Sequence, residues 1–183
     1  MAGKYDDVRV RRVVAGLAEN GRSTIVSDGF TETRLVTDAF VLNQIWQVPN
    51  CPPNVDDENT LGSEAVIPPP PNGFTHVLAT FPPDSSWAYG SGGYEASMAA
   101  AGAADGYVED GTDPGMHQTD SVDIITIVSG ECVVILEEAE TVLRAGDTFI
   151  QRGTKHAWRV SGDEPCVHST LMVGARRATA PGS

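Results

Sequence analysis

The amino-acid sequence predicts an all-β domain, in the form of an antiparallel sandwich or barrel. Short apolar runs rich in β-branched residues recur along the chain and end at turn sequences such as "SGE", "AGD" and "SGDEP". Only one segment, at about residues 94–104, has good helix-forming composition. The length of 183 residues suits one domain with its own core. Because strand-like runs follow one another with almost no helix between them, we expect antiparallel connections.

The N-terminal part predicts four strands and one long loop. The first three strand-like runs are "VRVRRVVAG", "GRSTIVSDG" and "FVLNQIWQV", and the fourth is "FTHVLATFPP". Residues 49–73 are rich in Pro, Asn and acidic residues, and the four prolines at 68–71 exclude helix and ladder hydrogen bonds. We therefore expect a surface loop between the third and fourth strands.

The rest of the chain predicts a Gly- and Ala-rich segment and then a dense series of strands. Residues 84–115 contain the predicted helix, and we expect them to form a flexible or helical, lid-like segment. Six strand-like runs lie within residues 116–175, namely "VDIITIV", "CVVIL", "TVL", "TFIQ", "HAWRV" and "CVHSTLMV". With N-terminal strands in 1–83 and a tail at 176–183, we expect a single domain over residues 1–183.

Charge and composition exclude several kinds of partner. The formal net charge of -13 disfavours nucleic acid and anionic membranes, which require a basic surface. No apolar stretch approaches the roughly 20 residues of a membrane span, and the N-terminus lacks the apolar core of a secretion signal. Cys51, Cys132 and Cys166 are odd in number and far apart, which favours reduced thiols. We expect a cytoplasmic protein. The sequence contains no Gly-rich phosphate loop, so we expect no nucleotide cofactor.

Strand alternation brings polar side chains to one face. If residues 117–127 are extended, one face carries His117, Thr119, Ser121, Asp123, Ile125 and Ile127. His156 and Trp158 share a face in the same way, and Gln151 ends a neighbouring strand. In a small barrel these faces point to one interior. We therefore expect His117, Asp123 and His156 to converge, with Thr119, Ser121, Gln151 and Trp158 lining the pocket.

The second half of the chain resembles the conserved barrel of the cupin superfamily. The first cupin motif usually has HxH followed by Glu and Gly, and His117, Thr119 and Asp123 occupy its positions here. The second motif usually opens with Gly and ends in His and Asn; "GDTFIQRGTKHAWRV" matches it, with Gly146 and His156. The resemblance implies a double-stranded β-helix, or jelly roll, with a small-molecule pocket. It also implies a homodimer, since exposed edge strands are often paired between copies, and we expect the N-terminal strands to contribute.

The departures from the cupin pattern leave two chemistries open. Thr119 replaces a histidine, Asp123 replaces a glutamate and Val160 replaces an asparagine, so the usual four-ligand metal set is incomplete. His117, Asp123 and His156 could form a 2-His-1-carboxylate site for a divalent metal such as iron, manganese or zinc. Alternatively, Asp123 orients a histidine and the set transfers protons without a metal.

Three functions follow from these alternatives. The leading one is a lyase or isomerase acting on a small molecule by dehydration or decarboxylation, with or without a bound metal, with His117 and His156 as catalytic residues assisted by Asp123. The second is an iron or manganese dioxygenase that uses the same three residues as ligands. The third is a ligand-binding cupin without catalysis, because a fold does not determine a function. His76 and His168 match no ligand position, and we expect both to be hydrogen-bonded structural histidines.

Overall fold

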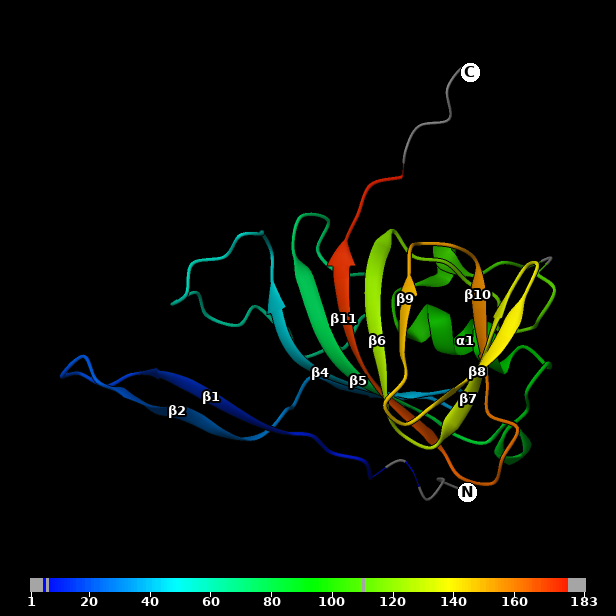
Figure 1. The fold of residues 1–183 in the computed structure, drawn as a ribbon, viewed down its shortest axis with the longest axis horizontal. Coiled ribbons are helices and arrows are strands. Elements are labelled where there is room, and N and C mark those ends of the chain that lie inside the picture. The colour runs from blue at the N-terminus through cyan, green and yellow to red at the C-terminus, as the bar shows by residue number, and fades with distance from the viewer. Residues whose placement is uncertain (1–4, 6, 110, 178–183) are drawn as a thin grey trace, which may run out of the picture.

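The larger sheet of the computed structural model has six antiparallel strands. The structure describes residues 5, 7–109 and 111–177, and the sheet order is β3-β4-β5-β11-β6-β9 (Figure 1). The strands are β3 (Arg34–Val36), β4 (Val41–Val48), β5 (Phe74–Phe81), β6 (Ser121–Ser129), β9 (Thr148–Gln151) and β11 (Cys166–Gly174). Buried and more exposed residues alternate along β6 and β11, so one face of the sheet points inward.

A three-stranded sheet covers part of that inward face. Its order is β10-β7-β8, built from β7 (Glu131–Leu136), β8 (Glu140–Arg144) and β10 (His156–Arg159). One apolar cluster joins the two sheets, with Ile125 and Ile127 from β6, Val134 from β7 and Trp158 from β10. The strands therefore form the all-β jelly roll that the sequence predicts, with the core between its sheets.

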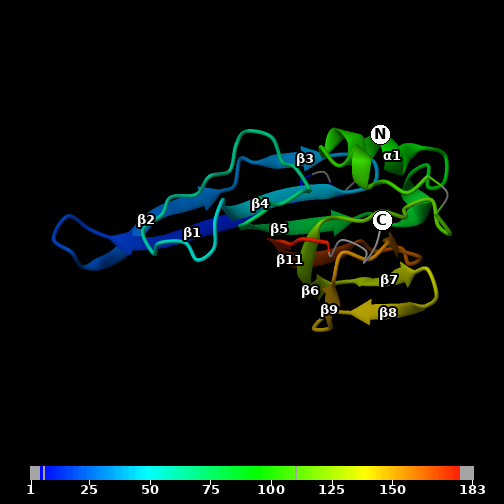
Figure 2. The same cartoon turned by 90° about the horizontal axis from the view of Figure 1, so that it is seen from above.

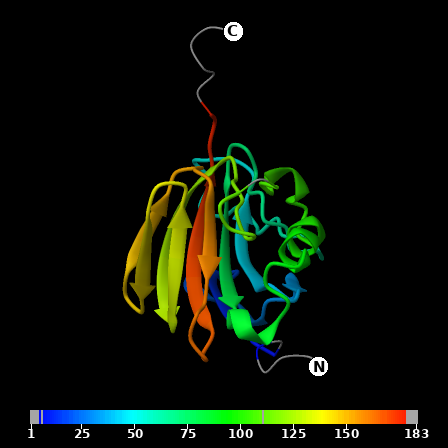
Figure 3. The ribbon, with the colours of Figure 1, turned by 90° about the vertical axis from the view of Figure 1, so that its right-hand side faces the viewer.

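The Gly- and Ala-rich segment packs along the β-sheets (Figure 3). It contains η1 (Asp84–Ser86), α1 (Gly93–Ala100) and η2 (Ala104–Gly106). The predicted helix at 94–104 ends at Ala100, because Gly102 adopts a positive φ of 65° and a short 3-10 turn follows. Tyr94 and Met98 are buried in the cluster that contains Phe40. The segment covers the core in this structure, and its opening as a lid stays a prediction.

The first two strands form a separate hairpin. Among the described strands, β1 (Arg11–Leu17) pairs only with β2 (Ser23–Phe30), and the hairpin projects from the barrel (Figures 1 and 2). Every residue of β2 is exposed. Exposed apolar side chains of the hairpin are Val13, Leu17, Ile25, Val26 and Phe30. A two-stranded hairpin is marginally stable alone, so this arm lacks the packing that stabilises the other strands.

The predicted loop and the predicted strands agree with the structure. The predicted loop at 49–73 separates β4 from β5, and strands occupy each strand-like run. The structure adds β3 (Arg34–Val36), which is too short for a periodic signal. In the described part of the chain, no helix has the length and apolar character needed to span a membrane.

Candidate active site

His117 and His156 are neighbours in the fold. Their backbones form an antiparallel bridge in which each N–H donates to the other residue's carbonyl over 2.9 Å. A pair bonded in this way places both side chains on the same face, and the ring centroids lie 4.2 Å apart. The two rings therefore lie together, as expected, but they meet as backbone neighbours, because the segment before β6 runs beside the start of β10.

Backbone carbonyls determine which nitrogen of each ring carries a proton. Nδ1 of His117 lies 2.8 Å from the carbonyl of Gly115, and Nδ1 of His156 lies 3.0 Å from the carbonyl of Thr154. Because a carbonyl oxygen can only accept, each Nδ1–H is the donor. Each Nε2 then presents a lone pair and has no hydrogen-bond partner among the described residues. Both rings can therefore accept a proton or a hydrogen bond from a ligand.

Burial keeps both rings neutral. It lowers the pKa of His117 to about 4, and the hydrogen bond to Gly115 opposes this only partly. Burial, and then the charge of His117, lower the pKa of His156 well below its ordinary value. At neutral pH each ring is therefore an unprotonated base, and a proton on one disfavours a proton on the other.

Asp123 is a buried carboxyl group without a cationic partner in the described part of the chain. It lies in β6 between Met172 of β11 and Gln151 of β9, and it is 3% exposed. Its Oδ1 has no hydrogen-bond partner among the described residues. Burial raises the pKa of Asp123 to about 6, and a hydrogen bond from Ser121 opposes the rise. The predicted hydrogen bond from a histidine N–H to Asp123 is not formed within the described chain.

His168 is a third histidine at the same cavity, which the sequence prediction placed away from the site. Its Nδ1 lies 2.7 Å from Oγ1 of Thr170, while its buried Nε2 has no hydrogen-bond partner among the described residues. The ring stacks on Trp158 and Phe81, with centroid distances of 5.5 and 5.1 Å. Burial lowers the pKa of His168 to about 4. The predicted hydrogen bond is present, but His168 lines the pocket and does not lie away from it.

Tyr94 connects helix α1 to the histidine pair. Its hydroxyl oxygen lies 3.1 Å from Nδ1 of His117, so it can share the proton that Nδ1 donates to Gly115. Its ring packs edge-on against Phe40, with centroids 6.1 Å apart. Burial raises the pKa of Tyr94 above its ordinary value, so the hydroxyl stays neutral. The segment 84–115 therefore supplies one wall of the site.

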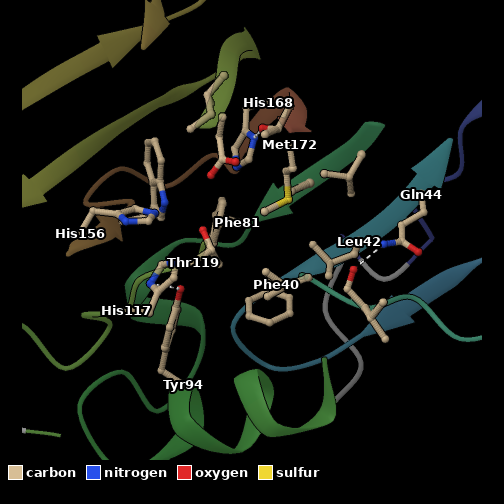
Figure 4. A pocket seen from close by; sticks show the side chains of 18 residues that line it. Phe40, Leu42, Gln44, Phe81, Tyr94, His117, Thr119, His156, His168 and Met172 are labelled. Carbon is tan, nitrogen blue, oxygen red and sulfur yellow. Dashed lines mark hydrogen bonds between the residues drawn. The ribbon is translucent and has the colours of Figure 1, made fainter. Parts of the chain in front are cut away.

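These side chains surround a small cavity of about 70 Å³. Figure 4 shows the three imidazole rings and Phe81 around a common space that continues toward Phe40 and Leu42. The polar lining residues are Gln44, Tyr94, His117, Thr119, Asp123, His156, His168 and Thr170. The apolar lining residues are Phe40, Leu42, Val66, Ile67, Val77, Ala79, Phe81, Ile125, Trp158 and Met172. A water-sized group needs about 10–15 Å³, so the cavity has room for about five such groups.

The four predicted pocket residues divide into two groups. Thr119 and Trp158 line the cavity. Ser121 and Gln151 are buried but lie outside its lining: Ser121 exchanges a 2.8 Å hydrogen bond with Thr119, and Gln151 accepts one of 2.6 Å from Thr154. Gln151 therefore supports the turn that leads to β10, because its amide is used there.

The sequence contains a signal for His168 that motif matching overlooks. His168, Thr170 and Met172 alternate along β11 and are buried together, which is the pattern of an inward face. His76 has the opposite placement: its Nε2 lies 2.8 Å from Oγ of Ser169, half-buried on the outer face. The hydrogen bond predicted for His76 is thus present, and its structural role stays a prediction. Tyr94 gave no signal beyond its position in the predicted helix.

The side chains do not fit the predicted three-ligand metal site. Within the described residues, no group of three or more His, Cys, Asp and Glu side chains is placed to hold a metal ion. The histidine pair offers two free Nε2 atoms, and Asp123 does not complete a ligand cluster with them. A 2-His-1-carboxylate site needs all three ligands around one point, and the described side chains do not provide that arrangement.

Comparison with known families supports the fold. Residues 107–174 match the family model of the cupin domain. The match covers both motifs, His117, Asp123 and His156, and it confirms the resemblance to the cupin superfamily. The cupin-like region therefore spans residues 107–174, and its strands form part of the all-β barrel.

Several known proteins share parts of the sequence or the fold. The chain is 40% identical over 53 residues to phomopsin biosynthesis cluster protein C' of Diaporthe leptostromiformis, which covers 28% of each protein. It is 37% identical over 65 residues to oryzines biosynthesis cluster protein J of Aspergillus oryzae, covering 34% of this chain and 36% of that one. The chain thus spans only about a third of the length of these relatives. A cupin 2 conserved barrel domain protein from Salinispora arenicola CNS-205 has a TM-score of 0.42 at 12% identity, covering 77% of this chain and 81% of that one.

Proposed function

We propose that this cupin domain is a small-molecule lyase or isomerase that works by proton transfer at the histidine pair. The observation that carries the proposal is the pair of Nε2 lone pairs at the cavity, left free because backbone carbonyls hold both Nδ1–H groups. General bases need this arrangement, in which the proton-accepting atom is unprotonated and within reach of a bound ligand.

The chemistry needs no external oxidant. In an elimination, one imidazole takes a proton from carbon, the C–H electron pair becomes the new double bond, and the leaving group departs with its own pair. In an isomerisation, the same proton returns to a different carbon. The neutral state of both rings at pH 7 supports the base role. A carboxylate in the same cavity stabilises the imidazolium that forms.

The surroundings support a reaction shielded from water. Tyr94 and other aromatic side chains line the cavity, and burial strengthens the interaction between Asp123 and a protonated imidazole. A cavity of about 70 Å³ favours a small substrate. We also propose that the reaction takes place in the cytoplasm and uses no nucleotide cofactor.

Deuterium exchange provides the test, because it detects proton transfer before the natural reaction is identified. The protein is incubated in D2O with a panel of small amines, alcohols, carbonyl compounds and carboxylic acids, and NMR records C–H exchange or conversion. We expect at least one compound to exchange, and both His117→Asn and His156→Asn to slow that exchange by about 100-fold or more, within the range for general base catalysis.

A chelator control separates this function from the dioxygenase. Exchange by the wild-type protein should be unchanged after treatment with EDTA, and elemental analysis should show no stoichiometric iron or manganese. Exchange that survives in both histidine variants refutes the proposal. Activity that requires added iron and consumes oxygen refutes it in favour of the dioxygenase. A protein that binds panel compounds without exchanging any of them is a ligand-binding cupin.

A further inference from the structure

We propose that the cavity binds a small organic cation, an alkylammonium compound, with its charged end at Asp123 and its carbon chain against the apolar wall. This inference rests on the proposed function for the identity of the site and goes further by naming the charge of the substrate. Its basis is the set of polar atoms that the fold buries around one cavity without partners.

Asp123 is the first of these groups. The carboxyl is 3% exposed, lines the cavity, and leaves Oδ1 without a partner among the described residues. None of the residues that line the cavity in the described part of the chain is Lys or Arg. An unpaired buried charge is strongly unfavourable. A ligand that brings a positive charge and N–H donors removes this penalty, whereas a carboxylate or phosphate ligand increases it.

The histidines point to the same kind of ligand. Nε2 of His117 and Nε2 of His156 are lone-pair acceptors, because both Nδ1–H groups are held by carbonyls. The buried Nε2 of His168 is a further atom at the cavity without a partner in the described chain. An ammonium group has three N–H donors and no acceptor, so it suits a cavity whose unpartnered polar atoms are acceptors.

The remaining walls suit the carbon part of such a ligand. Phe81, Trp158 and Tyr94 also line the cavity, and aromatic rings attract desolvated cations. Phe40 and Leu42 lie along the other end (Figure 4). The net charge of -13 also attracts cations to the protein from solution.

Binding of matched probes tests the charge of the ligand without requiring turnover. The probes are n-butylammonium chloride, 1-butanol and sodium propionate, which have similar sizes, titrated at about pH 7.5 with isothermal calorimetry and histidine-ring NMR. We expect n-butylammonium to bind and to shift the ring signals of His117, His156 and His168. Its affinity should exceed that of 1-butanol by about tenfold to a hundredfold, which is the range for a hydrogen bond to a charged group.

Two variants control the assignment. Asp123→Asn keeps the shape of the side chain and should lower the affinity for n-butylammonium to that of 1-butanol. Asp38→Asn removes an exposed carboxylate of the same type and should leave both affinities unchanged. Equal loss in the two variants would show that only the overall negative charge attracts the probe, and would overturn the inference.

The other outcomes are also decisive. Equal or tighter binding of 1-butanol or propionate at the three histidines overturns the cation assignment and leaves the proposed function standing. No binding of any probe overturns the inference, while the deuterium exchange experiment still decides the function. Manganese or zinc chloride that displaces n-butylammonium and shifts the same rings would identify a metal ion as the cation, and would overturn the organic ligand.

Discussion

Replacing Asp123 with asparagine should stabilise the protein at neutral pH. Burial raises the pKa of this carboxyl from 3.8 to about 6, and each pH unit corresponds to about 1.4 kcal/mol. The folded state holds its proton more tightly than the unfolded state, so folding stability falls as pH rises from about 4 to 6 and stays low above that range. The wild-type protein therefore carries a penalty of about 3 kcal/mol near pH 7.5, and of about 1 kcal/mol near pH 4.5.

Urea denaturation at these two pH values measures the effect. Asp123→Asn removes the ionisable group, so its advantage over the wild-type protein should be about 2 kcal/mol larger near pH 7.5 than near pH 4.5. In thermal unfolding, a gain of 3 kcal/mol corresponds to about 6–12 °C for a domain of this size. The neighbouring histidines titrate in both proteins, and their contribution largely cancels in the comparison.

Asp38→Asn is the matched control, because Asp38 is exposed and its replacement should change stability by no more than about 0.5 kcal/mol. An Asp123→Asn variant that is less stable than the wild-type protein near pH 7.5 would refute the reasoning. So would a stability difference that does not change with pH. Either result would mean that the carboxylate has a cationic or hydrogen-bonding partner that offsets its burial.

Three further predictions concern other parts of the molecule. The His168→Gln variant should lose less stability than the wild-type protein as pH falls from about 6.5 to 4. A histidine with a lowered pKa stabilises the fold above that range and loses this contribution as pH falls. Equal losses of stability in urea denaturation would contradict this prediction. Tyr94→Phe keeps the ring and removes one hydroxyl, so urea denaturation should show a loss of about 1 kcal/mol, and a loss above about 3 kcal/mol would contradict a role limited to that contact. We expect light scattering to show a homodimer for the wild-type protein and a monomer for the double variant Leu17→Ser/Ile25→Ser. The reason is that these two side chains are 72% and 61% exposed on the β1–β2 hairpin. A monomeric mass for the wild-type protein would refute the expected dimer.

The strands could be predicted because their signals are local. Alternation identifies the inward residues of β6, and turn residues mark the ends of the runs from β6 to β11. The same alternation predicts that Asp123 is inward, and it is buried as expected. Helix α1 was predicted from composition, while its end at Ala100 depends on the backbone of the following glycine.

The contacts of the site could not be predicted in the same way. Motif spacing assigned His117, Asp123 and His156 to one ligand set, but spacing along a chain does not determine distances between strands. The bridge between His117 and His156 depends on which segment runs beside the start of β10. His168 reaches the cavity because β11 pairs with both β5 and β6 in the middle of the larger sheet.

The sequence by itself determined the all-β class, the cupin motifs and the inward faces, because each depends on residue type and on a period of two along a strand. Only the tertiary structure decided which inward side chains meet. Strand order brings His168 and Tyr94 to the cavity, and carbonyl contacts determine the tautomers of His117 and His156. Burial without a partner then distinguishes Asp123 from the exposed carboxylates of this acidic chain, since desolvation depends on the packed surroundings rather than on the residue alone.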